Sequence, residues 1–329
     1  MVWLVMGALL GLALLSAALT WAARGYALRR QLLDQPGERR SHSVATPRGG
    51  GIAIVITLLV AALAAMAVWP TAIPSLLVAS LGLVLVAGIG WWDDHRPLPA
   101  MRRLLVHFVA ATLLAGLVKL HGGSWLLSLL VLFFTASLIN IWNFMDGING
   151  IASSQAVIAA LGLAPVLPWP YSLVAIVLGL ACLGFLPFNF PRARIFMGDV
   201  GSGALGYAVA VVLAVACLHT DIHWILLLVP VSPFLVDAGF TLLARMLSGQ
   251  RWMEPHTQHV YQRAVQAGAS HAQVTGMYFV LGLFSITVFN VCTRLQPRWE
   301  AAVAVAWFVA LTMLWLLLRE GLRPQQGIT

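Results

Sequence analysis

Eleven apolar stretches, most of them close to twenty residues long, constrain the fold of this chain more than any other feature. The hydrocarbon core of a membrane is about 30 Å thick and needs about 20 apolar residues per helix. Of the 329 residues, 60% are hydrophobic and 9% are charged, which excludes an ordinary soluble domain. We therefore predict an all-α, polytopic integral membrane protein with about 11 transmembrane helices. The expected spans are 3–23, 49–68, 71–91, 104–120, 125–142, 154–168, 170–188, 203–219, 223–246, 272–292 and 299–318.

Two further expectations concern the organisation of these spans. Pro165, Pro168 and Pro170 should shorten or break the sixth span, because proline lacks a backbone N–H group and clashes with the preceding turn. Residues 1–329 should form a single transmembrane domain, because neither an internal repeat nor a low-complexity segment divides them.

The basic residues are distributed unequally between the two sides of the predicted membrane. With eleven spans, all but three of the 19 Lys and Arg residues fall on one side, the exceptions being Lys119, Arg294 and Arg298. Cytoplasmic loops carry an excess of Lys and Arg. This rule predicts a periplasmic N-terminus and a cytoplasmic C-terminus. It also explains the net charge of +8 without a nucleic-acid partner.

The longer loops all lie on the predicted cytoplasmic side and hold most of the polar side chains. These loops span about residues 24–48, 92–103, 143–153, 189–202 and 247–271. A site for water-soluble substrates on the cytoplasmic face would have this arrangement, so we expect these five loops to form an active site.

The first two of these loops contain candidate phosphate-binding and acidic groups. In "ERRSHSVATPRGGG", Arg48 and three glycines precede a helix, which suits either phosphate binding at free N–H groups or anchoring on anionic lipid. In "WWDDHRPLPAMRR", Asp93 and Asp94 are adjacent at a helix end, where they are costly unless a cation lies near. A metal or phosphate role explains the pair, and a solvated turn with Arg103 and its neighbours is the alternative.

The next two loops combine glycines with amide and carboxylate side chains. In "NIWNFMDGINGIA", Asn140, Asn143 and Asp146 are three residues apart, which places them on one helix face just before the glycines end the helix. In "FMGDVGSGALG", Asp199 lies among small residues before a helix. That setting suits Mg²⁺, which takes one or two carboxylates and keeps phosphate oxygens as other ligands.

The fifth loop and one deep carboxylate complete the candidates. In "EPHTQHVYQR", His256 and His259 are suited to donate hydrogen bonds to phosphate, and an amphipathic surface helix is the alternative. Asp237 lies eight residues before Arg245, or about 12 Å deeper in a straight helix. We expect it to be either a structural pair or the floor of the site, because a lone charge at that depth is costly.

Taken together, these motifs resemble the polyprenyl-phosphate N-acetylhexosamine-1-phosphate transferase family, also called the glycosyltransferase 4 family. "SHSVATPRGGG", "WWDDH", "NIWNFMDGINGIA", "FMGDVGSGALG" and "EPHTQHVYQR" occur in the family's order over nearly the whole chain. The histidine loop is most similar to the branch that starts O-antigen and related lipopolysaccharide surface glycans.

The resemblance implies a role for each candidate residue. Asp199 is the expected principal magnesium ligand, and Asp93 and Asp94 are expected to handle metal or lipid phosphate. All three are therefore the expected catalytic residues. The expected substrate-binding residues are Asn143, Asp146, Asn149, His256, His259, Arg48 and Arg103. Asn149 stands where relatives often carry an acid, which makes it a candidate for sugar selection.

The activity implied is transfer of a phospho-N-acetyl sugar from a UDP-sugar to undecaprenyl phosphate, with release of UMP, in a bacterial inner membrane. The expected cofactor is Mg²⁺, with Mn²⁺ as a substitute, and a homodimer is a candidate assembly. The sugar stays open among N-acetylfucosamine, N-acetylquinovosamine and N-acetylglucosamine. The alternatives are a phospho-MurNAc-pentapeptide translocase activity and, in a different class, a secondary transporter. Transporters place their sites near the midplane, whereas these acids cluster at one face.

Overall fold

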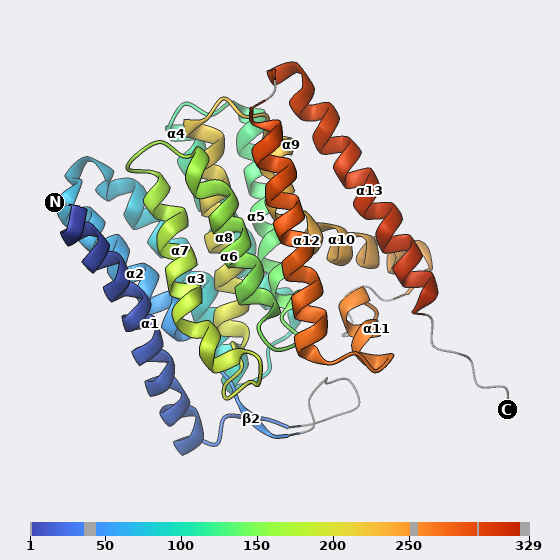
Figure 1. Ribbon diagram of the computed structural model, residues 1–329. Coiled ribbons are helices and arrows are strands. Elements are labelled where there is room, and N and C mark those ends of the chain that lie inside the picture. Colours follow the sequence, from blue (N-terminus) through green and yellow to red (C-terminus); the bar gives the residue numbers. More distant parts are fainter. Residues whose placement is uncertain (1, 36–43, 251–255, 295, 323–329) are drawn as a thin grey trace, which may run out of the picture.

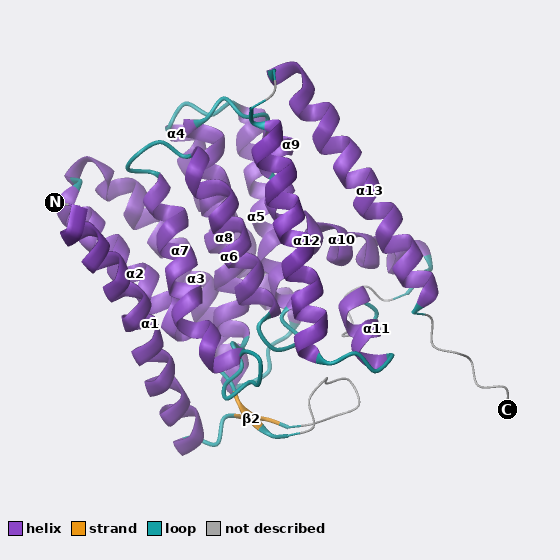
Figure 2. Ribbon diagram, in the orientation of Figure 1, coloured by secondary structure: helices purple, strands orange, loops and turns teal. Residues whose placement is uncertain are grey.

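The structure is a computed structural model that describes residues 2–35, 44–250, 256–294 and 296–322. It is a bundle of long helices with very little strand, as Figure 2 shows. The α-helices are α1 (Val2–Arg29), α2 (Ile52–Val68), α3 (Ile73–His95), α4 (Ala100–Leu120), α5 (Trp125–Met145), α6 (Ile151–Leu163), α7 (Ser172–Asn189), α8 (Asp199–His219), α9 (Trp224–Leu227), α10 (Ser232–Leu247), α11 (Val260–Gln266), α12 (His271–Cys292) and α13 (Glu300–Gly321). The strands β1 (Leu33–Asp34) and β2 (Thr46–Pro47) form one antiparallel pair.

The prediction of an all-α polytopic membrane protein is confirmed. Within the described residues, nine helical segments are long and apolar enough to cross a membrane, and two shorter apolar helices span Ile52–Val68 and Ile151–Val166. These segments coincide with the eleven predicted stretches. The sixth is short as expected, because α6 ends at Leu163 and the turn that follows it contains Pro165.

The prediction of one continuous ninth helix is wrong. Residues 223–246 form the short helix α9, a 3₁₀ turn over Val229–Val231 and then α10, with Pro230 and Pro233 each at the start of a new segment. Proline at these positions ends one helix and is tolerated in the first turn of the next. In Figure 1, α10 runs across the direction of α12. The depth estimated for Asp237 from a straight helix therefore does not hold.

The centre of the bundle is α8. In its most apolar window 83% of the residues are buried, compared with 11% in α1 and 17% in α13. Small side chains such as Gly, Ala and Ser let helices approach closely in a membrane, where packing and not water exclusion drives association. Since α8 begins at Asp199, its first carboxylate lies at the middle of one end of the bundle, surrounded by other helix ends.

The five long loops predicted to form a site all emerge at that same end of the bundle, the lower end in Figure 1. Residues 36–43 of the first loop and 251–255 of the fifth lie outside the described residues. This grouping is expected when successive helices cross the membrane in opposite directions, because every second loop then lies at the same end. That this end meets the cytoplasm, as the positive charges indicate, stays a prediction.

Candidate active site

The core of the site is a set of charged and amide side chains from α3, α4, α5 and α8. Arg103 Nη1 donates to Asp93 Oδ2 at 2.9 Å and to Asp199 Oδ2 at 3.0 Å, so one nitrogen bridges two carboxylates. Asn143 Nδ2 donates to Asp199 Oδ1 at 2.9 Å. Asp199 is the most open carboxylate of this group, with its side chain 33% exposed against 11% for Asp93. Four residues predicted from three different loops thus meet at one place.

The two adjacent acids Asp93 and Asp94 have different surroundings. Asp94 is buried, and its two oxygens accept the backbone N–H groups of Asp199 at 3.1 Å and Val200 at 3.0 Å. These N–H groups belong to the first turn of α8 and have no partner within the helix. The helix dipole also favours a carboxylate at this position. Asp94 therefore holds the start of α8 in place, whereas Asp93 faces Arg103 and Asp199.

A close approach between α3 and α8 makes this arrangement possible. A Cβ atom added to Gly90 on α3 would lie 2.2 Å from the backbone oxygen of Asp199, which no side chain tolerates. Only glycine lets the two backbones come this near. The glycine one helical turn before Asp94 thus allows that carboxylate to reach the N-terminus of α8.

The glycine-rich segment after Arg48 supports the site through its backbone. Gly50 N donates to Phe196 O at 2.9 Å, and Gly51 N donates to Met197 O at 2.8 Å. These two N–H groups are used within the protein, so the expectation that they bind phosphate is wrong for them. Arg48 Nη2 donates to the backbone oxygen of Asp94, and its Nε lies 4.0 Å from Asp94 Oδ1. Arg48 therefore lies beside Asp94 of the acidic pair.

The stripe of polar residues at the end of α5 divides into three environments. Asn143 joins Asp199 and also donates to Ser202 Oγ at 3.0 Å, whereas Asn140 donates to the oxygen of Ala136 in its own helix. Asp146 is the residue at which α5 ends. Burial raises the pKa of Asp146 well above its usual value, and the nearby charges of Asp199 and Asp94 raise it further. Asp146 therefore belongs to the same electrostatic cluster.

The hydrogen-bond partners of Asn149 lie outside the acidic cluster. Its Nδ2 donates to the oxygen of Pro191 at 3.1 Å, and its backbone oxygen accepts from Thr275 at 2.7 Å. Nearby Asn189, which the sequence analysis missed, accepts from Gly150 N at 2.7 Å and donates to Ile195 O at 2.9 Å. A buried asparagine at the end of an apolar helix was the available signal. Through these bonds, the side chains of Asn149 and Asn189 connect the segment before α6 to the segment after α7.

The predicted histidine pair lies at the start of α11. The rings of His256 and His259 are 4.8 Å apart, and His259 also stacks on Phe144, next to Asn143, at 6.4 Å. Burial lowers the pKa of His256 to about 4, with His259 and Arg245 adding to the effect, and burial also lowers the pKa of His259. Both shifts favour the neutral imidazole over the charged one. Neutral rings offer N–H donors to an anion, not positive charge.

Asp237 is surrounded by hydrogen-bond donors and lies next to His259. It accepts five hydrogen bonds, two of them from the first turn of α11. Of the two expectations for it, the structure supports the structural one, since these donors satisfy both of its oxygens. His259 Nδ1 lies 4.0 Å from Asp237 Oδ1.

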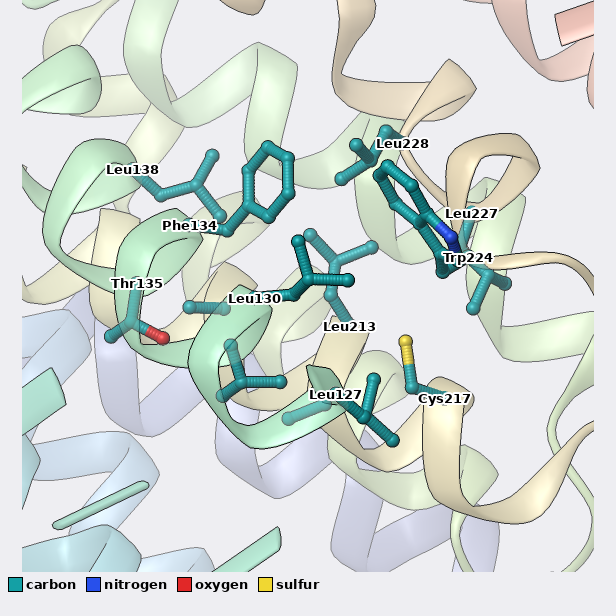
Figure 3. Close-up of a pocket in the computed structure, with 13 residues that line it drawn as sticks. Leu127, Leu130, Phe134, Thr135, Leu138, Leu213, Cys217, Trp224, Leu227 and Leu228 are labelled. Atoms are coloured by element: carbon teal, nitrogen blue, oxygen red, sulfur yellow. The ribbon is translucent and has the colours of Figure 1, made fainter. Parts of the chain in front are cut away.

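A separate apolar cavity lies between α5, α8 and α9 (Figure 3). It is partly open, and the side chains drawn in Figure 3 include Phe134, Leu138, Leu213 and Trp224. The cavity occupies the halves of α5 and α8 that lie away from Asn143 and Asp199. Its lining suits hydrocarbon, and it carries none of the predicted site residues.

Comparison with known proteins agrees with this architecture. A family model described as glycosyl transferase family 4 matches residues 76–217, a range that contains every predicted site residue except Arg48 and the two histidines. The decaprenyl-phosphate N-acetylglucosaminephosphotransferase of Mycobacterium tuberculosis (strain ATCC 25618 / H37Rv) is 30% identical over 95% of this chain and 90% of its own length.

Two more distant relatives extend the comparison. A probable undecaprenyl-phosphate N-acetylglucosaminyl 1-phosphate transferase of Bacillus subtilis (strain 168) is 28% identical over 79% of this chain and 77% of its own. A phospho-N-acetylmuramoyl-pentapeptide-transferase of Synechococcus sp. (strain JA-3-3Ab) is 28% identical over 82% of this chain and 87% of its own.

The fold and the site define a polytopic membrane protein with a carboxylate and arginine cluster at one end of its helices. The alignment over almost the full length of both chains then fixes the family. This chain belongs to glycosyl transferase family 4, among relatives that are polyprenyl-phosphate sugar-phosphate transferases.

Proposed function

We propose that this protein transfers a phospho-N-acetyl sugar from a UDP-sugar to undecaprenyl phosphate. An oxygen of the lipid phosphate forms a bond to the sugar-bearing phosphorus, the bond from that phosphorus to the bridging oxygen breaks, and UMP leaves. The products are undecaprenyl-diphospho-sugar and UMP. The observation that carries the proposal is the Asp93–Arg103–Asp199–Asn143 cluster, in a chain aligned along its length with transferases that act on polyprenyl phosphates.

The residues of the cluster suit a reaction that depends mainly on positioning and charge neutralisation. Arg103 lies where a phosphate oxygen would be attracted, and its contacts to Asp93 and Asp199 hold its guanidinium in place. Asn143 fixes the orientation of the Asp199 carboxylate. A phosphate monoester is already ionised at neutral pH, so the reaction needs no strong base, and Asp93 would act by holding Arg103 in place.

The donor set also suits Mg²⁺. Among the described residues, no group of three His, Cys, Asp or Glu side chains is placed to enclose a metal. Mg²⁺ is usually held by one or two carboxylates together with water and substrate phosphate, so an open site of this kind fits it. Asp199, the more exposed carboxylate, would be the principal ligand and Asp93 the second. When bound, the ion would neutralise the negative charge that develops on the transferred phosphoryl group.

The names of the relatives bear on which sugar is transferred. The names of the mycobacterial and Bacillus relatives specify N-acetylglucosamine, which favours that sugar over N-acetylfucosamine and N-acetylquinovosamine. We propose that the reaction starts an O-antigen or related surface glycan on the cytoplasmic face of the inner membrane. We favour this reaction over the transporter alternative, because the five donors to Asp237 leave that buried carboxylate no open side for a substrate.

The test is release of UMP by the purified protein with undecaprenyl phosphate, MgCl₂ and a panel of UDP-N-acetyl sugars. We expect one sugar to be consumed, and UMP formation to stop when EDTA is added and to return with Mg²⁺. Failure of all the sugars to release UMP in the presence of Mg²⁺ would contradict the proposed reaction. Consumption of UDP-MurNAc-pentapeptide alone would assign the chain to the peptidoglycan branch.

A further inference from the structure

Asp237 joins four helices through one buried carboxylate. Its side chain is 2% exposed and lies on α10. The donors are Val260 N on α11 (2.9 Å), Tyr261 N on α11 (3.4 Å), Tyr278 Oη on α12 (2.6 Å), Trp315 Nε1 on α13 (3.2 Å) and Thr241 Oγ1 on α10 (3.3 Å). An ionised carboxylate is stable in a buried position only when hydrogen bonds replace its lost hydration.

Two of these bonds fix the start of α11, a helix of only seven residues. A helix this short is not stable on its own and depends on tertiary contacts. The N–H groups of Val260 and Tyr261 belong to its first turn and have no partner within the helix. By accepting both, Asp237 determines where α11 begins. Arg263 adds a second attachment, since its Nη1 donates to Arg319 O on α13 at 3.2 Å.

Tyr261 connects the start of α11 to the end of α5, close to the acidic cluster. Its hydroxyl donates to the backbone oxygen of Phe144 at 2.9 Å, next to Asn143. The contact is tight, because a Cβ atom added to Gly147 would lie 2.2 Å from the same hydroxyl. Tyr261 is fully buried and stacks beside His259 with ring centroids 5.8 Å apart. The start of α11 is therefore in direct contact with the loop that contains Asp146.

His259 is the residue immediately before α11, and His256 lies against it. We propose that Asp237 is a positioning residue, whose carboxylate sets the place of His256 and His259 relative to Asn143 and Asp199. This inference rests on the proposed function, in which the histidines contact the phosphates of the UDP-sugar. Asp237 touches no substrate itself. It acts by holding the histidine pair at the distance that a bound diphosphate requires.

The first test asks whether Asp237 holds the first turn of α11 in place, a role that we call the anchor. It does not depend on catalysis. In the folded protein, His259 is 2% exposed and should react slowly with diethyl pyrocarbonate, whereas exposed His121 should react fast. In Asp237→Asn, the amide offers one acceptor oxygen in place of two, so the first turn of α11 should open more often. We expect modification of His259, followed by mass spectrometry, to become about tenfold faster, with His121 unchanged.

Glu300 provides a matched control. It is also a buried carboxylate, 5% exposed, and its Oε2 accepts the N–H group of His223 at 2.8 Å, but at the opposite end of the bundle. Glu300→Gln should lower the thermal midpoint without changing the reactivity of His259. An unchanged rate for His259 in Asp237→Asn, or an equal increase in Glu300→Gln, would overturn the anchor.

The second test measures the consequence for the reaction. In Asp237→Asn we expect KM for the UDP-sugar to rise about tenfold, while kcat and KM for undecaprenyl phosphate change by less than about twofold. A purely structural role would lower kcat in proportion to the folded fraction, as in Glu300→Gln. Equal changes in both KM values, or an unchanged KM for the UDP-sugar, would overturn the positioning role.

Tyr261→Phe keeps the inference testable if Asp237→Asn does not fold. This variant retains every bond to Asp237 and loses only the hydroxyl contact with Phe144, so KM for the UDP-sugar should rise about threefold. If the wild type releases no UMP while His259 becomes reactive in Asp237→Asn, the anchor stands and the proposed function fails. The two failures are therefore distinguishable.

Discussion

Asp199 and Asp237 are both acidic residues in apolar helices, but their surroundings differ in kind. Asp237 is 2% exposed and accepts five hydrogen bonds, mostly from neutral donors on four helices. The side chain of Asp199 is 33% exposed, accepts one bond from Asn143 and shares Arg103 with Asp93. A carboxylate with a complete set of donors stabilises the fold. A carboxylate that shares one cation with another carboxylate attracts further cations and anions, as a phosphoryl-transfer site requires.

Stability should separate the two residues most widely. Asp237→Ala leaves five donors without their acceptor, all of them on buried residues, and should cost about 3–5 kcal/mol of folding free energy. Asp199→Ala removes repulsion from Asp93 and Asp94 and should change stability by less than about 1 kcal/mol. Thermal unfolding in detergent measures both. Equal losses of stability would show that the hydrogen-bond inventory does not distinguish the two residues.

Arg103 should matter for activity through its charge more than through its shape. One nitrogen, Nη1, contacts both Asp93 and Asp199, so an ammonium group can replace it. We expect Arg103→Ala to lower kcat/KM for UMP release about 100-fold and Arg103→Lys to lower it less than about tenfold. Equal losses in both variants would indicate that the planar guanidinium fork is required.

The acidic pair should separate into a structural and a reacting member. Asp94→Asn keeps one acceptor for two N–H groups of α8 and should destabilise the protein by about 1–2 kcal/mol. Asp93→Asn should leave the thermal midpoint nearly unchanged and lower kcat further than Asp94→Asn does. The thermal midpoint and kcat are measured for both variants. A larger loss of kcat in Asp94→Asn at full stability would reverse the assignment.

The smallest expected effect is a shallow pH dependence of stability at the histidine pair. The folded pKa of His256 is about 4, below the ordinary value of about 6.5. Between these values the unfolded chain binds more protons, so the stability contributed by His256 is present above about pH 6.5 and is lost as the pH falls toward 4. His256→Gln should therefore unfold with a weaker pH dependence in this window. An identical dependence in wild type and His256→Gln would contradict the lowered pKa.

Much of the fold could be predicted because hydropathy alone defines membrane spans. All eleven apolar stretches became helical segments, and the prolines after α6 shortened it as expected. The break between α9 and α10 was missed although Pro230 and Pro233 signal it, since the surrounding residues are apolar enough to hide it. Hydropathy reports length and not direction, so the course of α10 needed the structure.

The sequence motifs predicted which residues form the site. They did not predict the hydrogen-bond partners of each side chain. The order of the motifs brought together Asp93, Asp199, Asn143 and Arg103 correctly. It could not separate Asp93 from Asp94, because the face that each side chain takes depends on the packing of α3 against α8. The donors to Asp237 are as far away as Trp315, 78 residues along the chain, and no local pattern indicates them. The donation of the Asn149 amide to Pro191 O is likewise a contact that no motif indicates.

In the proposed reaction, the open carboxylate of Asp199 serves catalysis and not the fold. The most direct test of this role is UMP release and thermal unfolding of Asp199→Asn, measured side by side with wild type at saturating Mg²⁺ and both substrates. We expect kcat to fall about 1,000-fold or more while the thermal midpoint stays within about 2 °C. Wild-type turnover in a folded Asp199→Asn protein would contradict this role.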